Sequence, residues 1–143
     1  TSSIPVISVK KNVRGAVKDI VFPVTPFQDD ENLFQKVKAL QYFFQAKLHL
    51  LFVNTPGVFV RDSVSRPQLT ALAKRLLLKD YTINIYNDLS EEDGIRGFAQ
   101  SIGADMVAIG THGRRGLNHL VTGSIAEDIV NHLECPIWTF KMS

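Results

Sequence analysis

The chain alternates between short, continuous runs of apolar residues and longer segments in which apolar residues recur at every third or fourth position. The short runs lie at Lys18–Val24, Leu48–Val53, Tyr81–Tyr86, Met106–Ile109 and Cys135–Lys141. Short apolar runs of this kind are typical of strands that are buried on both faces of a parallel sheet. The run at Tyr81–Tyr86 alternates and contains Thr and Asn, so we expect it at an edge of the sheet.

Longer segments separate these runs, and each repeats apolar residues with the period of a helix. The predicted stripes are Leu33, Val37, Leu40 and Phe44; Leu69, Leu72, Ala73 and Leu76; Ile95, Phe98, Ala99 and Ile102; and Ile125, Ile129, Val130 and Leu133. Each stripe predicts one amphipathic helix between two strands.

Residues that favour helix ends flank these stripes. The Asp29–Asp30 pair suits the start of the first helix, and Pro67 is predicted in the first turn of the second. Ser90–Asp93 resembles a capping box before the third helix, and Gly103 is well placed to end that helix. Residues 58–65, which precede the second helix, are predicted as a loop.

The elements therefore alternate as strand and helix, repeated along the chain and closed by a final strand. Such alternation predicts an α/β fold with a parallel, doubly wound sheet. We expect a five-stranded parallel sheet in the order 3-2-1-4-5 with helices on both faces, a Rossmann-like arrangement. The strand at Tyr81–Tyr86 is expected at one edge and Pro136–Phe140 at the other, before any partner strand is added. Ligand loops in such a sheet lie at the carboxyl ends of the strands.

Composition argues against several classes of protein. The 143 residues amount to one domain, and the 45% apolar content is enough for a hydrophobic core. A net charge of +2 is too small to indicate nucleic acid or an anionic membrane as the partner. No apolar run approaches the ~18 residues that span a bilayer, and no signal peptide is visible. The single cysteine, Cys135, fits a cytoplasmic protein, and we expect a small buried residue there.

The stretch from Ala104 to Phe140 contains the candidate chemistry. Gly110 and Gly113 are predicted to mark the exit of its strand, and Gly123 and Ser124 stand where the next helix begins. Glycine lets the backbone approach a ligand without a Cβ, and the free N–H groups of a helix start attract phosphate. The alternative is a plain strand-loop-helix connection whose glycines serve only turns and a cap.

The spacing G-x2-G-x9-G-S, with G-T-H-G-R from Gly110 and G-S-I-A-E-D-I-V from Gly123, resembles the nucleotide-binding signature of the universal stress protein family. The resemblance extends from about Val17 to Lys141 and is strongest in the last third of the chain. It implies that this loop holds the ribose and phosphates of ATP, with or without Mg²⁺. The binding residues that it implies are Thr25, Val53, Ile109, Gly110, His112, Gly113, Arg114, Gly123, Ser124 and Ile125.

The end of the first strand departs from the family pattern. Family members often have P-x-D there, with the acid touching the nucleoside, whereas this chain has Pro23, Val24 and Thr25. The Thr25 hydroxyl can hydrogen-bond but is not an anionic acceptor for the ribose, and Pro26 removes a backbone donor. We expect this departure to affect nucleoside affinity and to leave the phosphate loop intact. The resemblance also places the main chain of Val53 against the adenine.

Catalysis has weaker support than binding. His112 fits either a general base or a histidine packed beside the cleft, and we favour the second. Arg114 and Arg115 fit phosphate ligands and solvated charges equally well. The sequence has no G-x-S-x-G elbow and no Walker motif, and His119 and His132 lack the spacing of zinc ligands.

The preferred hypothesis is an adenine-nucleotide-binding regulatory module of the stress response that turns ATP over slowly or not at all. One alternative is an ATP-hydrolysing or adenylating enzyme on a related fold, which needs a metal carboxylate or a charged clamp in the cleft. The other is a nucleotide-free stress-protein domain that serves as a dimerisation surface.

The first residues repeat the last strand. Ile4–Lys10 and Cys135–Lys141 share the pattern x-Pro-apolar-apolar-hydroxyl-apolar-Lys. Because the family that the chain resembles includes tandem proteins, we interpret residues 1–13 as the last strand of a preceding domain or a linker, and residues 14–143 as the nucleotide-binding domain. Ile4–Val9 is then expected antiparallel to the last strand, within the chain or by exchange in a homodimer.

Overall fold

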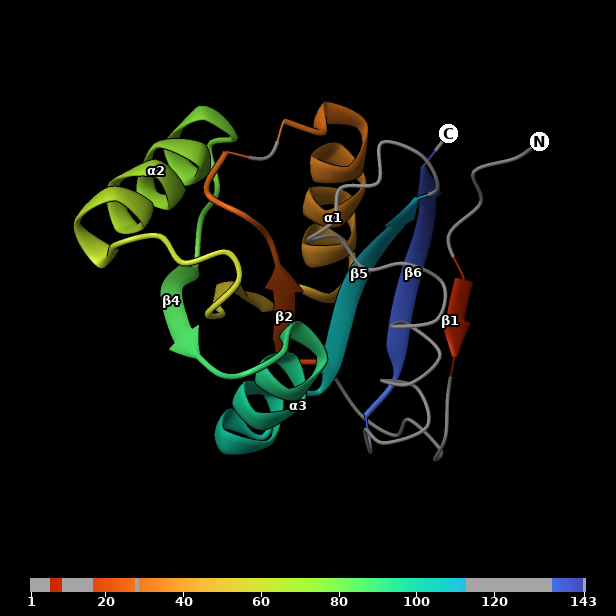
Figure 1. Ribbon diagram of the computed structural model, residues 1–143. Helices are drawn as coiled ribbons and strands as arrows, with labels where there is room; N and C mark the ends of the chain where they lie inside the picture. The colour runs from red at the N-terminus through yellow and green to blue at the C-terminus, as the bar shows by residue number, and fades with distance from the viewer. Residues whose placement is uncertain (1–5, 9–16, 28, 113–134, 143) are drawn as a thin grey trace.

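The computed structural model describes residues 6–8, 17–27, 29–112 and 135–142. In these ranges the chain forms one sheet with helices packed against both of its faces (Figure 1). The strands are β1 (Val6–Ser8), β2 (Asp19–Pro23), β3 (Lys47–Asn54), β4 (Tyr81–Asn87), β5 (Met106–His112) and β6 (Ile137–Met142). The helices are α1 (Glu31–Phe44), α2 (Asp62–Arg75) and α3 (Glu91–Ile102).

The strands lie side by side in the order β1-β6-β5-β2-β3-β4. All neighbouring pairs from β6 to β4 are parallel. Counted from β2, this is the expected order 3-2-1-4-5, so the α/β, Rossmann-like prediction is confirmed. β4, the strand with the alternating sequence, forms an edge of the sheet as predicted.

The core forms two layers because successive residues of a strand point to opposite faces of the sheet. In β2, Ile20 and Phe22 belong to one buried cluster, whereas Val21 belongs to the other. The first cluster also contains the apolar stripes of α1 and α2, and the second contains Ile95 and Phe98 of α3. Each of these helices therefore packs its expected apolar stripe on the sheet, α1 and α2 on one face and α3 on the other.

The start of α2 differs from the prediction. The helix begins at Asp62, so Pro67 lies inside it rather than in its first turn, and the predicted loop ends before residue 62. The N–H groups of Val64 and Ser65 both donate to the carbonyl of Arg61 at 2.9 Å. This turn closes ahead of the proline, which then removes one internal hydrogen bond and crowds the carbonyl four residues earlier.

The ends of the other helices agree with the sequence. Asp30 is the residue before α1, although its side chain makes no capping hydrogen bond. The Ser90 hydroxyl accepts a hydrogen bond from the Asp93 N–H at 3.2 Å, as a capping box requires. Gly103 follows α3 with φ of 63°, the left-handed conformation that glycine adopts without strain.

The N-terminal strand pairs with the last strand of the same chain. β1 runs antiparallel to β6, with Val6 opposite Thr139 and Ser8 opposite Ile137. The expected antiparallel pairing is thus confirmed for the described part of Ile4–Val9. As a result, β6 has a neighbour on each side.

Two residues from the predicted strands have clear structural roles. The ring of His49 lies between the hydroxyl of Thr82 (Nδ1 to Oγ1, 2.7 Å) and the carboxylate of Asp19 (Nε2 to Oδ1, 2.8 Å), so this histidine connects neighbouring strands. Cys135 was expected to begin the last strand, which is wrong because β6 begins at Ile137. Cys135 is partly exposed, and the burial of its thiol raises its pKa to about 11.

None of the described helices is long and apolar enough to cross a membrane.

Candidate functional site

The sheet has its topological switch point between β2 and β5. From β2 the chain moves outward through β3 to β4, and it then returns to β5 on the other side of β2 and moves outward to β6. In parallel sheets of this topology, ligands bind in a crevice above the carboxyl ends of the two strands at the switch point. Thr25 follows β2 at this edge, and β5 ends there at His112.

Thr25 stands just past the end of β2 on a fixed backbone. The N–H of Val24 donates to the carbonyl of Leu51 at 2.8 Å, which continues the sheet pairing beyond Pro23. Thr25 itself is partly buried, whereas Val24 and Pro26 are buried. This arrangement brings the Thr25 hydroxyl to the carboxyl edge with little backbone freedom.

Val53 lies near the carboxyl end of β3, directly against α3. Its side chain is only 8% exposed and packs on Gly94. A Cβ built on Gly94 would lie 2.8 Å from Cγ2 of Val53 and closer still to its Cγ1. The glycine therefore allows α3 to approach the end of β3, and Val53 fixes that approach.

A cavity of about 200 Å³ opens beside Val53, between the end of β3 and the start of α3. Its lining residues come from β3, the connection to α2, the connection to α3 and the first residue of α3: Phe52, Val53, Thr55, Val58, Leu89, Ser90 and Glu91. The cavity has apolar walls with a few polar groups, which suits a flat apolar ring carrying hydrogen-bonding atoms.

Glu91, the first residue of α3, carries the acidic group of this cavity. Burial of the carboxyl, together with the nearby charge of Glu92, raises the pKa of Glu91 to about 8, although the start of a helix favours a carboxylate. Sequence reasoning missed Glu91 because it assigned the whole run Ser90–Asp93 to helix capping. The sequence did contain a signal, because Glu91, Glu92 and Asp93 are three consecutive acids and a capping box needs only one.

Gly110 has a different environment from the one expected. It was predicted to mark the exit of its strand, but it lies inside β5, which continues to His112. A Cβ on Gly110 would lie 2.5 Å from Cδ2 of Leu33, so the glycine allows α1 to pack closely on the strand. The neighbouring Ile109 is 1% exposed, and its side chain belongs to the core. A ligand at this edge can therefore meet Ile109 only through its main chain.

The rest of the predicted loop lies outside the described residues. This applies to Gly113, Arg114, Gly123, Ser124 and Ile125, and to the side chain of His112. Gly113 follows His112 directly, so the loop begins where β5 ends. Of the expected site residues, Thr25, Val53, Ile109 and Gly110 are described, and all four lie at or near the carboxyl ends of β2, β3 and β5.

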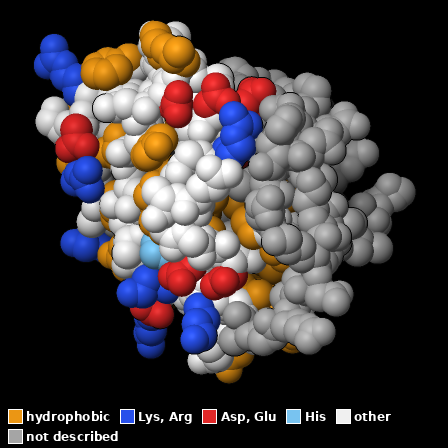
Figure 2. All heavy atoms as spheres, turned by 90° about the horizontal axis from the view of Figure 1, so that it is seen from below, with side chains coloured by type: hydrophobic (Ala, Val, Ile, Leu, Met, Phe, Trp, Pro, Cys, Tyr) orange, Lys and Arg blue, Asp and Glu red, His pale blue; other side chains and the backbone are white. Residues whose placement is uncertain are grey.

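Exposed apolar side chains surround the same edge. Among the described residues, Phe27, Val58, Phe59, Val64 and Leu89 are large, apolar and exposed, and they lie on the connections after β2, β3 and β4 and in the first turn of α2. The space-filling view shows exposed hydrophobic side chains at its upper edge, beside a group of acidic ones (Figure 2).

Within the described ranges, no group of three or more His, Cys, Asp or Glu side chains is close enough to hold a metal ion.

Comparison with known proteins agrees with this architecture. The universal stress protein MJ0531 of Methanocaldococcus jannaschii is 28% identical over 94% of this chain and 88% of its own length. A universal stress protein solved in complex with cAMP covers 90% of this chain and 100% of its own, with a TM-score of 0.67 at 15% identity. The Archaeoglobus fulgidus universal stress protein in complex with dAMP covers 87% of this chain and 98% of its own, with a TM-score of 0.60 at 17% identity.

The two solved structures share the fold of this chain, and the sequence match adds the family. Residues 16–141 match the universal stress protein family, which is nearly the whole chain and includes both β2 and the glycine stretch after β5. The chain therefore belongs to the universal stress protein family.

Proposed function

We propose that this domain is a regulatory module that binds an adenine nucleotide, ATP in the first instance, above the carboxyl ends of β2 and β5. The observation that carries the proposal is the switch point, because the glycine sequence that resembles the family's nucleotide signature begins at Gly110 in the last part of β5 and continues beyond His112 in the sequence. Parallel sheets bind ligands in the crevice at this point. The cAMP and dAMP in the two solved relatives support the choice of an adenine nucleotide.

The proposed site divides into a nucleoside side and a phosphate side. Thr25 would hydrogen-bond the ribose, and the main chain of Val53 would face the base beside the 200 Å³ cavity. The N–H groups around Gly113 and Gly123, with the hydroxyl of Ser124, would take the phosphates, because the start of a helix favours an anion. Ile109, Gly110, His112, Arg114 and Ile125 would border the same ligand.

A calorimetric titration with ATP, AMP and GTP tests the proposal. Ser124→Ala should weaken ATP binding about tenfold or more, since a hydrogen bond to a charged group contributes about 1.5–3 kcal/mol. Gly113→Val should block the site without unfolding the domain. Thr25→Asp should change the affinity for the nucleoside side, upward for ATP, and leave the Ser124→Ala effect in place. Ser101→Ala is a matched control on α3, away from the proposed contacts.

The second candidate is a nucleotide-free domain that acts through assembly. Thr25 in place of the acid favours it, and so does the antiparallel pairing of β1 with β6, because that edge would join a second domain or a second copy. If the parent protein gives no heat and no thermal shift with millimolar ATP, the nucleotide proposal fails and this candidate replaces it. A homodimer or a tandem domain would then be the functional unit, which sedimentation of the intact protein would reveal.

A further inference from the structure

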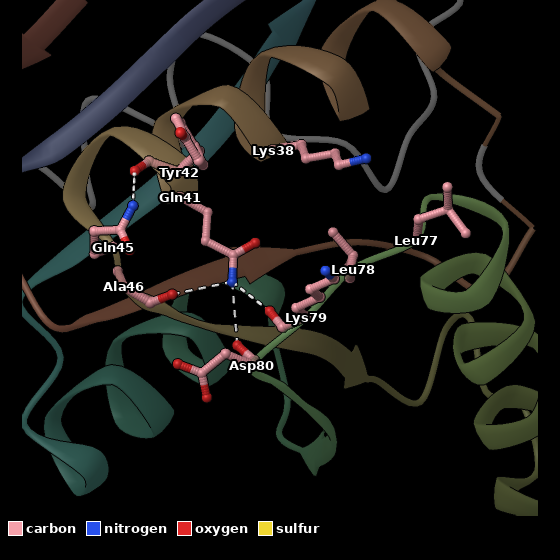
Figure 3. A pocket seen from close by; sticks show the side chains of 9 residues that line it. All are labelled: Lys38, Gln41, Tyr42, Gln45, Ala46, Leu77, Leu78, Lys79 and Asp80. Atoms are coloured by element: carbon pink, nitrogen blue, oxygen red, sulfur yellow. Dashed lines mark hydrogen bonds between the residues drawn. The ribbon is translucent and has the colours of Figure 1, made fainter.

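A second cavity, of about 560 Å³, lies near the amino ends of β3 and β4, at the opposite end of the strands from the proposed nucleotide site. Figure 3 shows the residues that line it. Its walls come from the last turns of α1 and from the connection between α2 and β4. Both walls lead into the amino ends of strands, whereas the switch-point crevice lies above the carboxyl ends. The volume falls within the range of about 300–1,000 Å³ that is usual for small-molecule sites.

The backbone around this cavity comes largely from the ends of two helices, α1 and α2. In the described part of the chain, the non-glycine residues with positive φ are Gln45 (56°), Leu77 (57°) and Asp80 (55°), and all three line the cavity. Gln45 ends α1, where a left-handed residue is common. Leu77 ends α2 in the same way, because its N–H donates to the carbonyl of Lys74 at 3.1 Å and the N–H of Leu78 donates to that of Ala73 at 3.0 Å. Leucine is less suited than glycine to this conformation, and its side chain is 73% exposed at the rim of the cavity.

Gln41 provides a fixed polar group in the floor of the cavity. It is only 8% exposed, and its Nε2 donates to the carbonyls of Ala46 (3.0 Å), Lys79 (2.7 Å) and Asp80 (3.1 Å). These bonds identify the nitrogen of the amide and use up its donor capacity. Figure 3 shows the Gln41 amide oxygen on the other side of the group, turned toward the cavity. The cavity therefore offers a preorganised acceptor.

The charge of the cavity is positive. Lys38 and Lys79 both line it, and the carboxylate of Asp80 lies 3.6 Å from the ammonium of Lys47. The ion pair with Lys47 offsets the charge of Asp80, the acidic residue of the lining. A bound molecule therefore meets the positive charges of Lys38 and Lys79. The remaining walls at Leu77 and Leu78 are apolar.

We propose that this cavity binds a small organic acid with a compact apolar ring. Lys38 and Lys79 would hold its carboxylate, the ring would cover Leu77, and a hydroxyl on the ring would donate to the Gln41 amide oxygen. Such a molecule meets each of the groups described above, and it replaces the solvent that now covers Leu77. The site is separate from the nucleotide site and does not depend on it.

Titration of the ¹⁵N-labelled protein with 4-hydroxybenzoate, followed by amide chemical shifts, tests the proposal. Saturable shifts should appear at residues 38–46 and 77–80. Benzoate, which lacks the hydroxyl, and 4-hydroxybenzyl alcohol, which lacks the carboxylate, should each bind several-fold more weakly. Lys79→Glu should weaken 4-hydroxybenzoate binding at least about tenfold, whereas Lys74→Glu, on α2 outside the cavity, should not.

Leu77→Gly gives an independent test, because glycine relieves the left-handed strain and also removes the apolar wall. The variant should be more stable than the parent and should bind 4-hydroxybenzoate more weakly. Absence of saturable shifts at millimolar 4-hydroxybenzoate, shifts confined to other residues, or equal binding by Lys79→Glu would overturn the proposal. Gly113→Val, which blocks the nucleotide site, should leave this binding unchanged, so the two proposals succeed or fail separately.

Discussion

Gly94→Ala tests the packing that fixes the nucleoside side of the site. In most helices this change stabilises, because alanine is favoured over glycine by about 0.8–1 kcal/mol in a helix interior. Here the added Cβ would lie 2.8 Å from Cγ2 of Val53, closer still to Cγ1, and 3.1 Å from its Cβ. Val53 is buried and β-branched, so it has little rotamer freedom with which to move aside.

The two effects oppose each other, and overpacking should dominate. Forcing an extra methyl into a well-packed core typically costs about 1–3 kcal/mol. After subtraction of the helix gain, Gly94→Ala should lower the free energy of unfolding by up to about 2 kcal/mol. In a Val53→Ala background the obstructing methyls are gone, so the same change should stabilise by about 0.5–1 kcal/mol. The coupling energy between the two sites should then be about 1–3 kcal/mol, the cost of the overpacking.

Urea unfolding followed by circular dichroism of the parent, both single variants and the double variant completes this cycle. Gly97→Ala in the same helix is the control, because its Cβ would lie 2.8 Å from the hydroxyl of Tyr86, the far end of a partly exposed side chain that can shift. That variant should be within about 0.5 kcal/mol of the parent. A coupling energy near zero, or a Gly94→Ala protein as stable as Gly97→Ala, would refute the packing argument.

Other predictions concern α3 and the cavity at its start. Gly103→Ala should destabilise by about 1–2 kcal/mol in thermal unfolding, since the residue has φ of 63°, whereas Gly57→Ala, which meets no atom within 4 Å, should not. Ser90→Ala should cost about 1 kcal/mol by loss of the bond from the Asp93 N–H, and Ser90→Asp should restore most of it. The pKa of Glu91, about 8 against an ordinary 4.5, means that the folded state binds this proton more tightly, so its contribution to stability should decline as the pH rises between those values. Glu91→Gln should remove that decline, and an unchanged pH profile would contradict the burial of the carboxyl.

Sequence patterns were sufficient for the architecture. The period of two in β4 and the periods of three to four in α1, α2 and α3 arise from local geometry, which each segment carries in its own residues. The same holds for Gly103 and the Ser90 cap, whose partners lie within a few residues. Pro67 misled because a proline is favoured in the first turn of a helix, and its position in the sequence does not reveal that α2 already begins at Asp62.

The site was only partly predictable. The resemblance to the family identified Thr25 and Val53, and in the structure Thr25 follows β2 and Val53 lies near the carboxyl end of β3. It did not reveal that Gly110 is needed by Leu33, because those residues are far apart in the chain and meet only when α1 packs on β5. Glu91 was assigned to helix capping, and its burial beside residues of β3 and of the connections around it became visible only in the folded chain.

Within the described ranges, the sequence by itself therefore determined the elements and their order, and it also indicated the family, because these depend on periodicity and on short-range motifs. The tertiary structure decided which glycines are required by packing, that β1 covers β6, and where cavities open at the two edges of the sheet. Burial and long-range contact are properties of the folded chain as a whole. A pKa near 8 for a carboxyl, or an amide nitrogen shared by three carbonyls, arises only when distant segments meet.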